Sequence, residues 1–176
     1  CALVDPGAMP QTILDTLEKN ELALQKIFLT HAHFDHIGGL QQLHELTGAP
    51  VWVSKIDSAD PAGMTHGRLI FTDTYEDGNE LTLGTIKIRV IATPGHTPGG
   101  IVLFAATEQG NIAFVGDTLF PGSHGRTDLS GGDEAAIMRS LSKLAKMLPP
   151  DTVCLTGHGD STTMARELMQ NPFMQM

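Results

Sequence analysis

Apolar residues in the first fifty positions alternate between strand-like and helix-like spacing. The opening CALVDPG has the pattern of a strand that ends in a Pro-Gly turn, and Ile13, Leu14 and Leu17 then predict an amphipathic helix near residues 10–20. A short apolar strand follows in QKIFLT, a second helical pattern ends at Gly48, and PVWVS returns to strand spacing. This order predicts that the chain begins with a βαβαβ unit.

The middle of the chain is rich in β-forming residues. The segments ELTLGTIKIRVIAT, GGIVLFAAT and GNIAFVG are joined by glycine-containing turns, which predicts an antiparallel meander. A helix is expected over residues 133–148, followed by a strand in TVCLT and a last helix over residues 161–170. The mixture predicts an α/β fold, and the length of 176 residues favours one domain spanning residues 1–176.

The composition is that of an ordinary globular protein with an acidic balance. The net charge is −9, and the 11 Lys and Arg residues offer little for a phosphate-binding surface, so no nucleic-acid partner is expected. No apolar stretch approaches the ~20 residues of a membrane span, so no membrane association is expected either. Cys1 and Cys154 are too few for a disulfide framework or a cysteine-type zinc ribbon, and a cytoplasmic location is expected.

Histidine and aspartate residues follow four of the predicted strands. The segment LTHAHFDHIGG at residues 29–39 places three histidines and an aspartate in six consecutive positions, directly after an apolar run. Three more such residues each follow a later strand end. Because the loops beyond the carboxyl ends of strands converge on one rim, seven side chains are expected to meet there. These are His31, His33, Asp35, His36, His96, Asp117 and His158.

The chemistry of these seven side chains is that of metal ligands. Imidazole nitrogen and carboxylate oxygen suit zinc, iron or manganese, and the absence of cysteine from the set argues against a purely structural thiolate site. Seven ligands exceed the need of one tetrahedral ion. Two divalent metal ions that share a carboxylate and a water would use all seven and leave open positions for a substrate. The pattern therefore favours a dinuclear catalytic centre, with zinc as the expected metal.

Four motifs in the same order, THAHFDH, TPGHT, GDTLF and TGHG, resemble the metallo-β-lactamase superfamily. The segments GDTLFPGSHGRTDLSGGD and GHGDSTTMARELMQNPF are similar to its short, single-domain branch related to glyoxalase II, the hydroxyacylglutathione hydrolases. The resemblance implies a four-layer αββα sandwich of two mixed β-sheets flanked by helices, with metals at one edge. It also implies three sets of metal-centre residues: His31, His33 and His96 for one metal; Asp35, His36 and His158 for the other; and Asp117 as the bridge, with Asp5 supporting the ligands from behind.

Three departures from the family pattern are visible. Relatives carry further strands before LVDPG, so the domain is expected to be incomplete at its N-terminus. The chain ends at Met176 without the helical domain that binds glutathione in full-length glyoxalase II, which leaves the glutathione-binding residues unassigned. Gly100 stands where many relatives have a second histidine, which changes the surroundings of the centre without removing a ligand.

The expected activity is hydrolysis. Two divalent ions lower the pKa of a bridging water from ~15.7 toward neutrality, and one of them can polarise a carbonyl group. The expected partner is a small-molecule acyl thioester, such as a hydroxyacylglutathione, cleaved by attack of a metal-bridging hydroxide. Asp35 and Asp117 are the catalytic candidates, because their carboxylates can hold the proton of the hydroxide, and neither is assigned as a separate general acid.

Three other functions are compatible with the same residues. One is a mononuclear iron enzyme that oxidises a glutathione persulfide, with the iron on His31, His96 and a carboxylate. A second is a lactonase or β-lactamase of the same fold. The third, which is not an enzyme, is a fragment that binds metal without turnover.

Five other polar residues are expected to have structural roles. His44 is predicted to be a partly buried packing residue on its helix. His66 and His124 lie in glycine-rich loops and are predicted to be exposed. Arg126 and Asp128, in GRTD, are predicted to form an ion pair beside the site.

Overall fold

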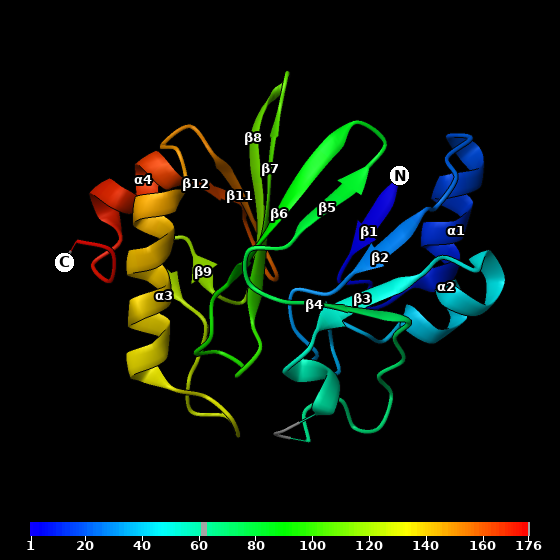
Figure 1. Cartoon of the computed structure of the whole chain (residues 1–176), viewed down its shortest axis with the longest axis horizontal. Helices are drawn as coiled ribbons and strands as arrows, with labels where there is room; N and C mark the ends of the chain where they lie inside the picture. Colours follow the sequence, from blue (N-terminus) through cyan, green and yellow to red (C-terminus); the bar gives the residue numbers. More distant parts are fainter. Residues whose placement is uncertain (61–62, 176) are drawn as a thin grey trace.

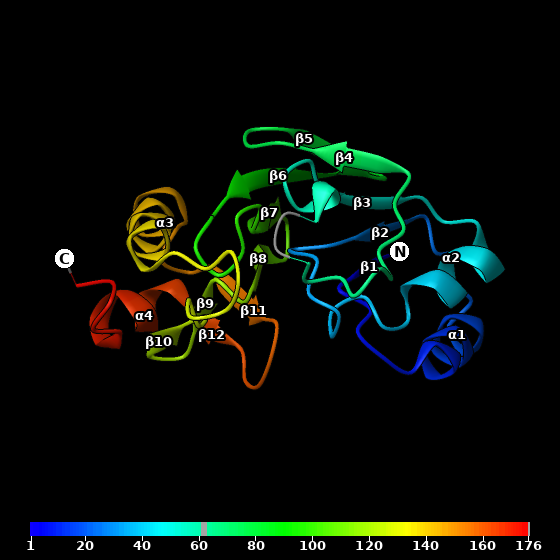
Figure 2. The same cartoon turned by 90° about the horizontal axis from the view of Figure 1, so that it is seen from below.

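Two β-sheets with helices on their outer faces make up the structure, a computed structural model that describes residues 1–60 and 63–175 (Figures 1 and 2). The first sheet has the strand order β1-β2-β3-β4, and the second has the order β12-β11-β8-β7-β6-β5. The strands of the first sheet are β1 (Ala2–Val4), β2 (Lys26–Phe28), β3 (Val51–Ser54) and β4 (Asp73–Tyr75). Those of the second are β5 (Glu80–Leu83), β6 (Ile86–Ala92), β7 (Ile101–Thr107), β8 (Gly110–Gly116), β11 (Val153–Thr156) and β12 (Thr162–Thr163).

The helices divide between the two sheets. The first sheet is covered by α1 (Pro10–Lys19) and α2 (Leu40–Thr47), and the second by α3 (Glu134–Met147) and α4 (Met164–Gln170) (Figure 2). A short 3-10 helix, η1 (Asp57–Ala59), follows β3, and a separate hairpin pairs β9 (Leu119–Phe120) with β10 (Ser123–His124). The predicted α/β sandwich is confirmed.

The first sheet shows how strand periodicity builds the layers. Ile27 and Val51 point toward α1 and α2, whereas Phe28 and Trp52 point toward the second sheet, because successive strand residues face opposite sides. The pairs β1–β2, β2–β3 and β3–β4 are all parallel. The expectation of two mixed sheets therefore holds for the second sheet only, within the part of the chain that the structure describes.

The second sheet contains the predicted meander. Antiparallel pairs join β5, β6, β7 and β8 in sequence order. The chain then crosses through α3 and returns as β11, which pairs parallel with β8. Asp133 caps α3 by accepting a hydrogen bond from the Ala136 N–H, which satisfies one free donor of the first helical turn.

The short strands were not expected from the sequence. β4 has three residues, and β9, β10 and β12 have two each, so none is long enough to produce a recognisable alternation. β12 occupies the start of the segment predicted as the last helix, so that α4 begins at Met164 rather than at residue 161. These short segments are strands because they hydrogen-bond to neighbouring strands in the folded protein, as β12 does to β11 in an antiparallel pair.

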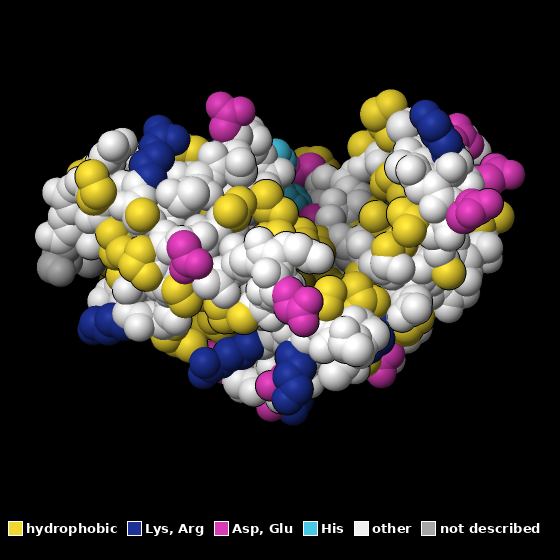
Figure 3. All heavy atoms as spheres, turned by 90° about the horizontal axis from the view of Figure 1, so that it is seen from above, with side chains coloured by type: hydrophobic (Ala, Val, Ile, Leu, Met, Phe, Trp, Pro, Cys, Tyr) yellow, Lys and Arg dark blue, Asp and Glu magenta, His cyan; other side chains and the backbone are white. Residues whose placement is uncertain are grey.

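A hollow separates the two halves of the molecule when it is seen from above, and hydrophobic side chains lie along it (Figure 3). An apolar groove lies between the edge strand β1 and the inner face of the second sheet, lined by Val4, Phe28, Leu103 and their neighbours. Histidine side chains are visible in the hollow (Figure 3). The candidate ligands lie at the rim of the two sheets, in the loops that follow β2, β6, β8 and β11.

Candidate metal centre

The seven predicted side chains come together at one rim. Four of them lie in the loop between β2 and α2, and one follows each of β6, β8 and β11. All are placed by the same rule, because a polar residue just beyond the carboxyl end of a strand is directed to the rim rather than into the core. They form two clusters on either side of Asp117. We call His31, His33 and His96 the first cluster and Asp35, His36 and His158 the second cluster.

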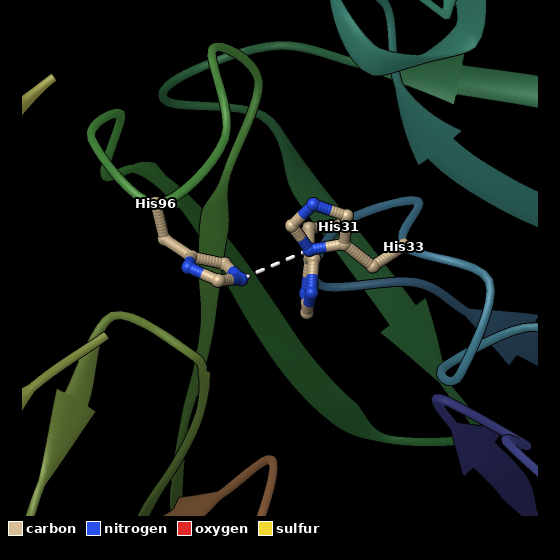
Figure 4. Close-up of side chains that lie close together, drawn as sticks. All are labelled: His31, His33 and His96. Atoms are coloured by element: carbon tan, nitrogen blue, oxygen red, sulfur yellow. Dashed lines mark hydrogen bonds between the residues drawn. The ribbon is translucent and has the colours of Figure 1, made fainter. Parts of the chain in front are cut away.

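The first cluster is buried. The exposures of its residues are 2% for His31, 8% for His33 and 5% for His96. His33 Nδ1 lies 2.9 Å from His96 Nε2, and these two side chains point toward each other from different loops (Figure 4). His31 Nε2 is buried without a hydrogen-bond partner. One ligand atom from each of the three residues lies within 4.8 Å of the others, so the three nitrogens converge on one point.

The second cluster is more open. His36 is 3% exposed, whereas His158 is 55% and Asp35 is 43% exposed. His36 Nε2 lies 3.2 Å from His158 Nε2, and His158 Nε2 lies 3.3 Å from Asp35 Oδ2. The exposed carboxylate and imidazole give this side of the rim access to solvent.

Asp117 lies between the two clusters. Its Oδ2 is 3.4 Å from His96 Nε2 and 3.6 Å from His158 Nε2, and its Oδ1 is 3.5 Å from His36 Nε2. The Oδ1 atom is buried without a hydrogen-bond partner. Asp117 thus faces residues of both clusters with a single carboxylate, which is the arrangement needed for a bridging ligand.

The donor set fits divalent metal ions. With metal–nitrogen bonds of ~2.0–2.1 Å in a tetrahedral site, the ligand nitrogens are expected to lie ~3.3 Å apart. The observed nitrogen separations of 2.9 Å and 3.2 Å are close to this value. Buried polar atoms ordinarily have hydrogen-bond partners, so His31 Nε2 and Asp117 Oδ1, which face the clusters and lack them, are consistent with a coordinating role.

The far nitrogens of the imidazoles are held by other groups. His36 Nδ1 lies 3.0 Å from Asp5 Oδ2, as the family resemblance implied for Asp5. His96 Nδ1 lies 2.8 Å from the Arg126 carbonyl oxygen, and His31 Nδ1 lies 3.0 Å from the Thr30 hydroxyl. Partners of this kind set the orientation and tautomer of a ligating histidine. Neither the Thr30 hydroxyl nor the Arg126 carbonyl oxygen was predicted as a supporting group, and a backbone oxygen such as that of Arg126 leaves no signal in a sequence.

The pKa values of the rim histidines are shifted in opposite directions in the two clusters. Burial and the neighbouring imidazoles lower the pKa of His31 well below its usual value, and they lower that of His33 to about 4. Burial is the largest single influence on the pKa of His36 and lowers it, but the hydrogen bond to Asp5 together with the charges of Asp5, Asp117 and Asp35 outweighs burial, and the net shift is upward. Burial raises the pKa of Asp117 against the opposing effect of the nearby imidazoles. His31 and His33 are therefore neutral near pH 7, which is the form that binds metal.

Most of the five polar residues that were predicted to have structural roles have those roles in the structure. His44 is half-buried, with Nδ1 2.8 Å from the Ala49 carbonyl oxygen, and the Arg126–Asp128 ion pair is present at 2.7 Å. The prediction for His124 was wrong. Its side chain is only 11% exposed, because it packs edge-on against Phe173.

His66 is exposed, as predicted, but it belongs to a hollow beside the first cluster. Its ring stacks on that of Phe34 at 4.7 Å with an interplanar angle of 9°. The hollow has a volume of about 200 Å³, and its other lining residues include His33, Met64 and Leu129. Phe34 was not among the predicted site residues, although it lies inside the HAHFDH motif and is 45% exposed.

Comparison with known proteins identifies relatives over the whole described fold. The family model described as the metallo-β-lactamase superfamily matches residues 1–158. The hydroxyacylglutathione hydrolase GloC of Haemophilus influenzae is 31% identical over 185 residues, which cover 98% of this chain and 86% of that protein.

Three solved structures have the same fold. The B3 metallo-β-lactamase BLEG-1 superposes with a TM-score of 0.89 at 32% identity, covering 99% of this chain and 88% of its own. TTHA1623 in a di-iron-bound form superposes with a TM-score of 0.85 at 33% identity, and the match covers 97% of this chain and 87% of the TTHA1623 chain. ETHE1 from Myxococcus xanthus superposes with a TM-score of 0.82 at 30% identity, and the match covers 97% of this chain and 72% of the ETHE1 chain. Within residues 1–60 and 63–175, every helix is too short or too polar to cross a membrane.

Proposed function

The chain belongs to the metallo-β-lactamase superfamily, and from this premise we propose that it is a metal-dependent hydrolase of acyl thioesters. The observation that carries the proposal is the rim itself. Two clusters of nitrogen and oxygen ligands adjoin each other, with Asp117 facing both and with the exposed Asp35 and His158 on the open side. A structural metal site is closed to solvent, whereas a catalytic one keeps an open face.

We assign the first cluster to one metal ion, the second cluster to another, and Asp117 to the bridge. Zinc is the proposed metal, and a relative of the same fold is known in a di-iron form. Divalent ions held by these residues would activate water at neutral pH and polarise a carbonyl group. The protein's own contribution is orientation: Asp5, Thr30 and the Arg126 carbonyl hold the far nitrogens of three imidazoles.

Asp35 and Asp117 are the proposed holders of the proton of the attacking water. Asp117 Oδ1 has no hydrogen-bond partner, and Asp35 lies on the open side, where a substrate carbonyl can approach. The hollow lined by Phe34 and Leu129 lies beside the first cluster and offers an apolar wall to the organic part of the substrate. Its volume of about 200 Å³ suits a small molecule rather than a polymer.

The leaving group decides between thioesters and amides. A thiolate, with a conjugate-acid pKa near ~8.5, departs without a proton donor, whereas a β-lactam nitrogen must be protonated or otherwise stabilised. Two potential donors within the described part of the chain are engaged elsewhere. The Tyr75 hydroxyl donates to the Leu29 carbonyl, and the Arg126 guanidinium is paired with Asp128. This supports a thioester substrate, as does the hydroxyacylglutathione hydrolase among the relatives.

A β-lactam substrate is the second candidate, favoured by the close structural similarity to a B3 metallo-β-lactamase. A mononuclear iron enzyme would use His31, His96 and a carboxylate, and would leave the second cluster without a role. The presence of both clusters therefore favours the dinuclear hydrolase.

Parallel rate measurements test the proposal. The zinc-loaded protein should be assayed with S-lactoylglutathione, a simple acyl thioester and nitrocefin, using one sample for all three. We expect kcat/KM for at least one thioester to exceed that for nitrocefin by about 100-fold or more, which corresponds to about 2.7 kcal/mol of transition-state discrimination. Nitrocefin turnover within about tenfold of both thioesters would favour the β-lactamase instead. Oxygen uptake with one bound iron per chain would favour the persulfide oxidation.

A further inference from the structure

A buried carboxylate outside the seven rim residues joins two of the loops that carry them. Asp57 begins η1 just after β3, and its side chain is completely buried, with 0% exposure. Asp57 Oδ2 accepts a hydrogen bond from the Thr97 hydroxyl at 2.8 Å, and Oδ1 accepts one from the Gly99 N–H at 2.7 Å. The backbone N–H of Ala32 lies close enough to the same carboxylate to lower its pKa. The Asp57 side chain is therefore hydrogen-bonded to the β6–β7 loop and faces a backbone N–H of the β2–α2 loop.

The donors are located inside the loops of the first cluster. Ala32 lies between the two histidines of the β2–α2 loop, and Thr97 directly follows the histidine of the β6–β7 loop. A displacement of either donor moves an adjacent ligand with it, because neighbouring Cα atoms are linked at a fixed distance of ~3.8 Å. The carboxylate of Asp57 thus sets the separation of the two loops at the positions where their ligands converge.

Gly99 shows how closely the β6–β7 loop is held against η1. A Cβ atom at this position would lie 2.5 Å from Asp57 Oδ1 and 2.3 Å from Ser54 Oγ, closer than real side chains approach. Ser54 Oγ in turn accepts a hydrogen bond from the Asp57 N–H at 3.1 Å. The carboxylate reaches the loop only because the loop presents a bare backbone there.

The burial of Asp57 is costly for the fold. Among the described residues, no lysine or arginine forms an ion pair with Asp57, and burial raises its pKa against the effect of its hydrogen bonds. Buried charges without a cationic partner are rare, because desolvation costs several kcal/mol even after relaxation. The Thr97 and Gly99 donors belong to one ligand loop, and the Ala32 N–H faces the carboxylate from the other, so the geometry of those loops is the feature that this carboxylate stabilises.

We propose that Asp57 is a positioning residue of the metal centre, which fixes the β2–α2 loop relative to the β6–β7 loop so that the three nitrogens of the first cluster converge. The inference rests on the metal centre of the proposed function but not on its substrate. It assigns to Asp57 a role in metal affinity, although Asp57 does not itself contact the ligand atoms.

Cobalt(II) titration of the metal-free protein tests this role without any substrate. The d–d absorption of bound cobalt reports ligand geometry, and the titration gives affinity. We expect Asp57→Ala to weaken cobalt binding by about 10–100-fold and to alter the spectrum, as loss of an orienting group does in other metal sites. Asp57→Asn keeps one acceptor oxygen and a similar shape, so it should recover most of the affinity and the parent spectrum.

The matched control is Glu167→Ala. Glu167 is also completely buried and accepts hydrogen bonds from Thr162, Asn171 and the Gly122 N–H, but these partners lie outside the first cluster's loops. It should lose thermal stability while binding cobalt with the parent affinity and spectrum. If Asp57→Ala does not fold, Thr97→Val removes a single bond to the carboxylate and should give a smaller shift in the same direction.

Three outcomes would overturn the inference. Asp57→Ala, or Thr97→Val in its place, could bind cobalt with the parent affinity and spectrum. Glu167→Ala could show the same loss as Asp57→Ala, which would reduce the effect to general destabilisation. The parent protein could bind no cobalt, which would remove the metal centre as well. A parent that binds cobalt but cleaves no thioester would instead overturn the proposed substrate and leave the role of Asp57 intact.

Discussion

Substitution of Gly157 by alanine is expected to disable the metal centre while leaving the fold in place. A Cβ atom at this position would lie 2.1 Å from Asp117 Oδ1 and 2.7 Å from His36 Cε1. Ordinary contact begins at 3.4 Å, so the carboxylate oxygen would have to move by about 1.3 Å. Metal–ligand distances tolerate only about 0.2 Å of change, so the bridge between the two metal ions would be lost.

The magnitude follows from that displacement. A misplacement of ~1 Å at a reacting centre can cost ~100-fold in rate, which is about 2.7 kcal/mol of transition-state stabilisation. We therefore expect Gly157→Ala to bind less than two metal ions per chain and to lose activity by about 100-fold or more. The φ angle of Gly157 lies outside the left-handed region, so alanine adds no backbone strain there and the melting temperature of the metal-free protein should change little.

Gly159→Ala is the matched control in the same loop. Gly159 has φ +72° and nothing within 4 Å of an added Cβ, so this substitution carries a backbone cost of about 1–2 kcal/mol without a steric one. Metal content by atomic emission, thermal denaturation and turnover should be measured for both variants. Full metal content and activity in Gly157→Ala, or an equal loss in Gly159→Ala, would refute the argument that the close approach to Asp117 is what requires glycine.

Two further predictions concern the histidines. His96→Ala should reduce metal content and activity together, whereas His44→Ala, which loses one hydrogen bond to a backbone carbonyl, should change neither by more than a few-fold; equal effects would contradict the ligand assignment. On acidification below pH ~6.5, metal should leave in two steps, the second cluster first, because the pKa of His36 is raised and protons compete there at higher pH, whereas that of His33 is lowered to about 4. Metal content after dialysis across this pH range checks the order, and release in a single step would show that the clusters titrate together.

The seven rim residues were predictable because one simple signal marks them. Each is a histidine or aspartate just beyond a strand end, and parallel or mixed sheets bring such positions to one edge. Asp57 follows β3 by three residues and carries the same signal, but it lacks the glycine that directly precedes His96, Asp117 and His158. The difference between a ligand and a supporting residue lies in where the side chain points, which spacing alone does not determine.

The fold was predictable where elements are long and periodic. The leucine stripes of α2 and α3 and the meander of β6, β7 and β8 all have enough residues for a period to appear. The exposure of His124 was mispredicted for a different reason. Its local sequence, GSHGR, is typical of a loop, but Phe173 from the far end of the chain packs against the ring. A contact of this kind depends on tertiary structure, so neither composition nor local pattern could reveal it.

The charge of the rim links the ligands to the residues behind them. Asp35 and Asp117 lie among the clusters, Asp5 is bonded to His36, and Asp57 lies close enough to His96 to interact with its charge. Four carboxylates, if ionised, balance the charge of two divalent ions, so a loaded centre is neutral before an attacking hydroxide is counted and carries a charge of −1 with it. Bringing two carboxylates to the rim with two more behind it is unfavourable, and bound cations offset their mutual repulsion. The supporting aspartates therefore have two effects at once: their hydrogen bonds orient the ligand loops, and their charge favours occupation of the site by two divalent ions over one.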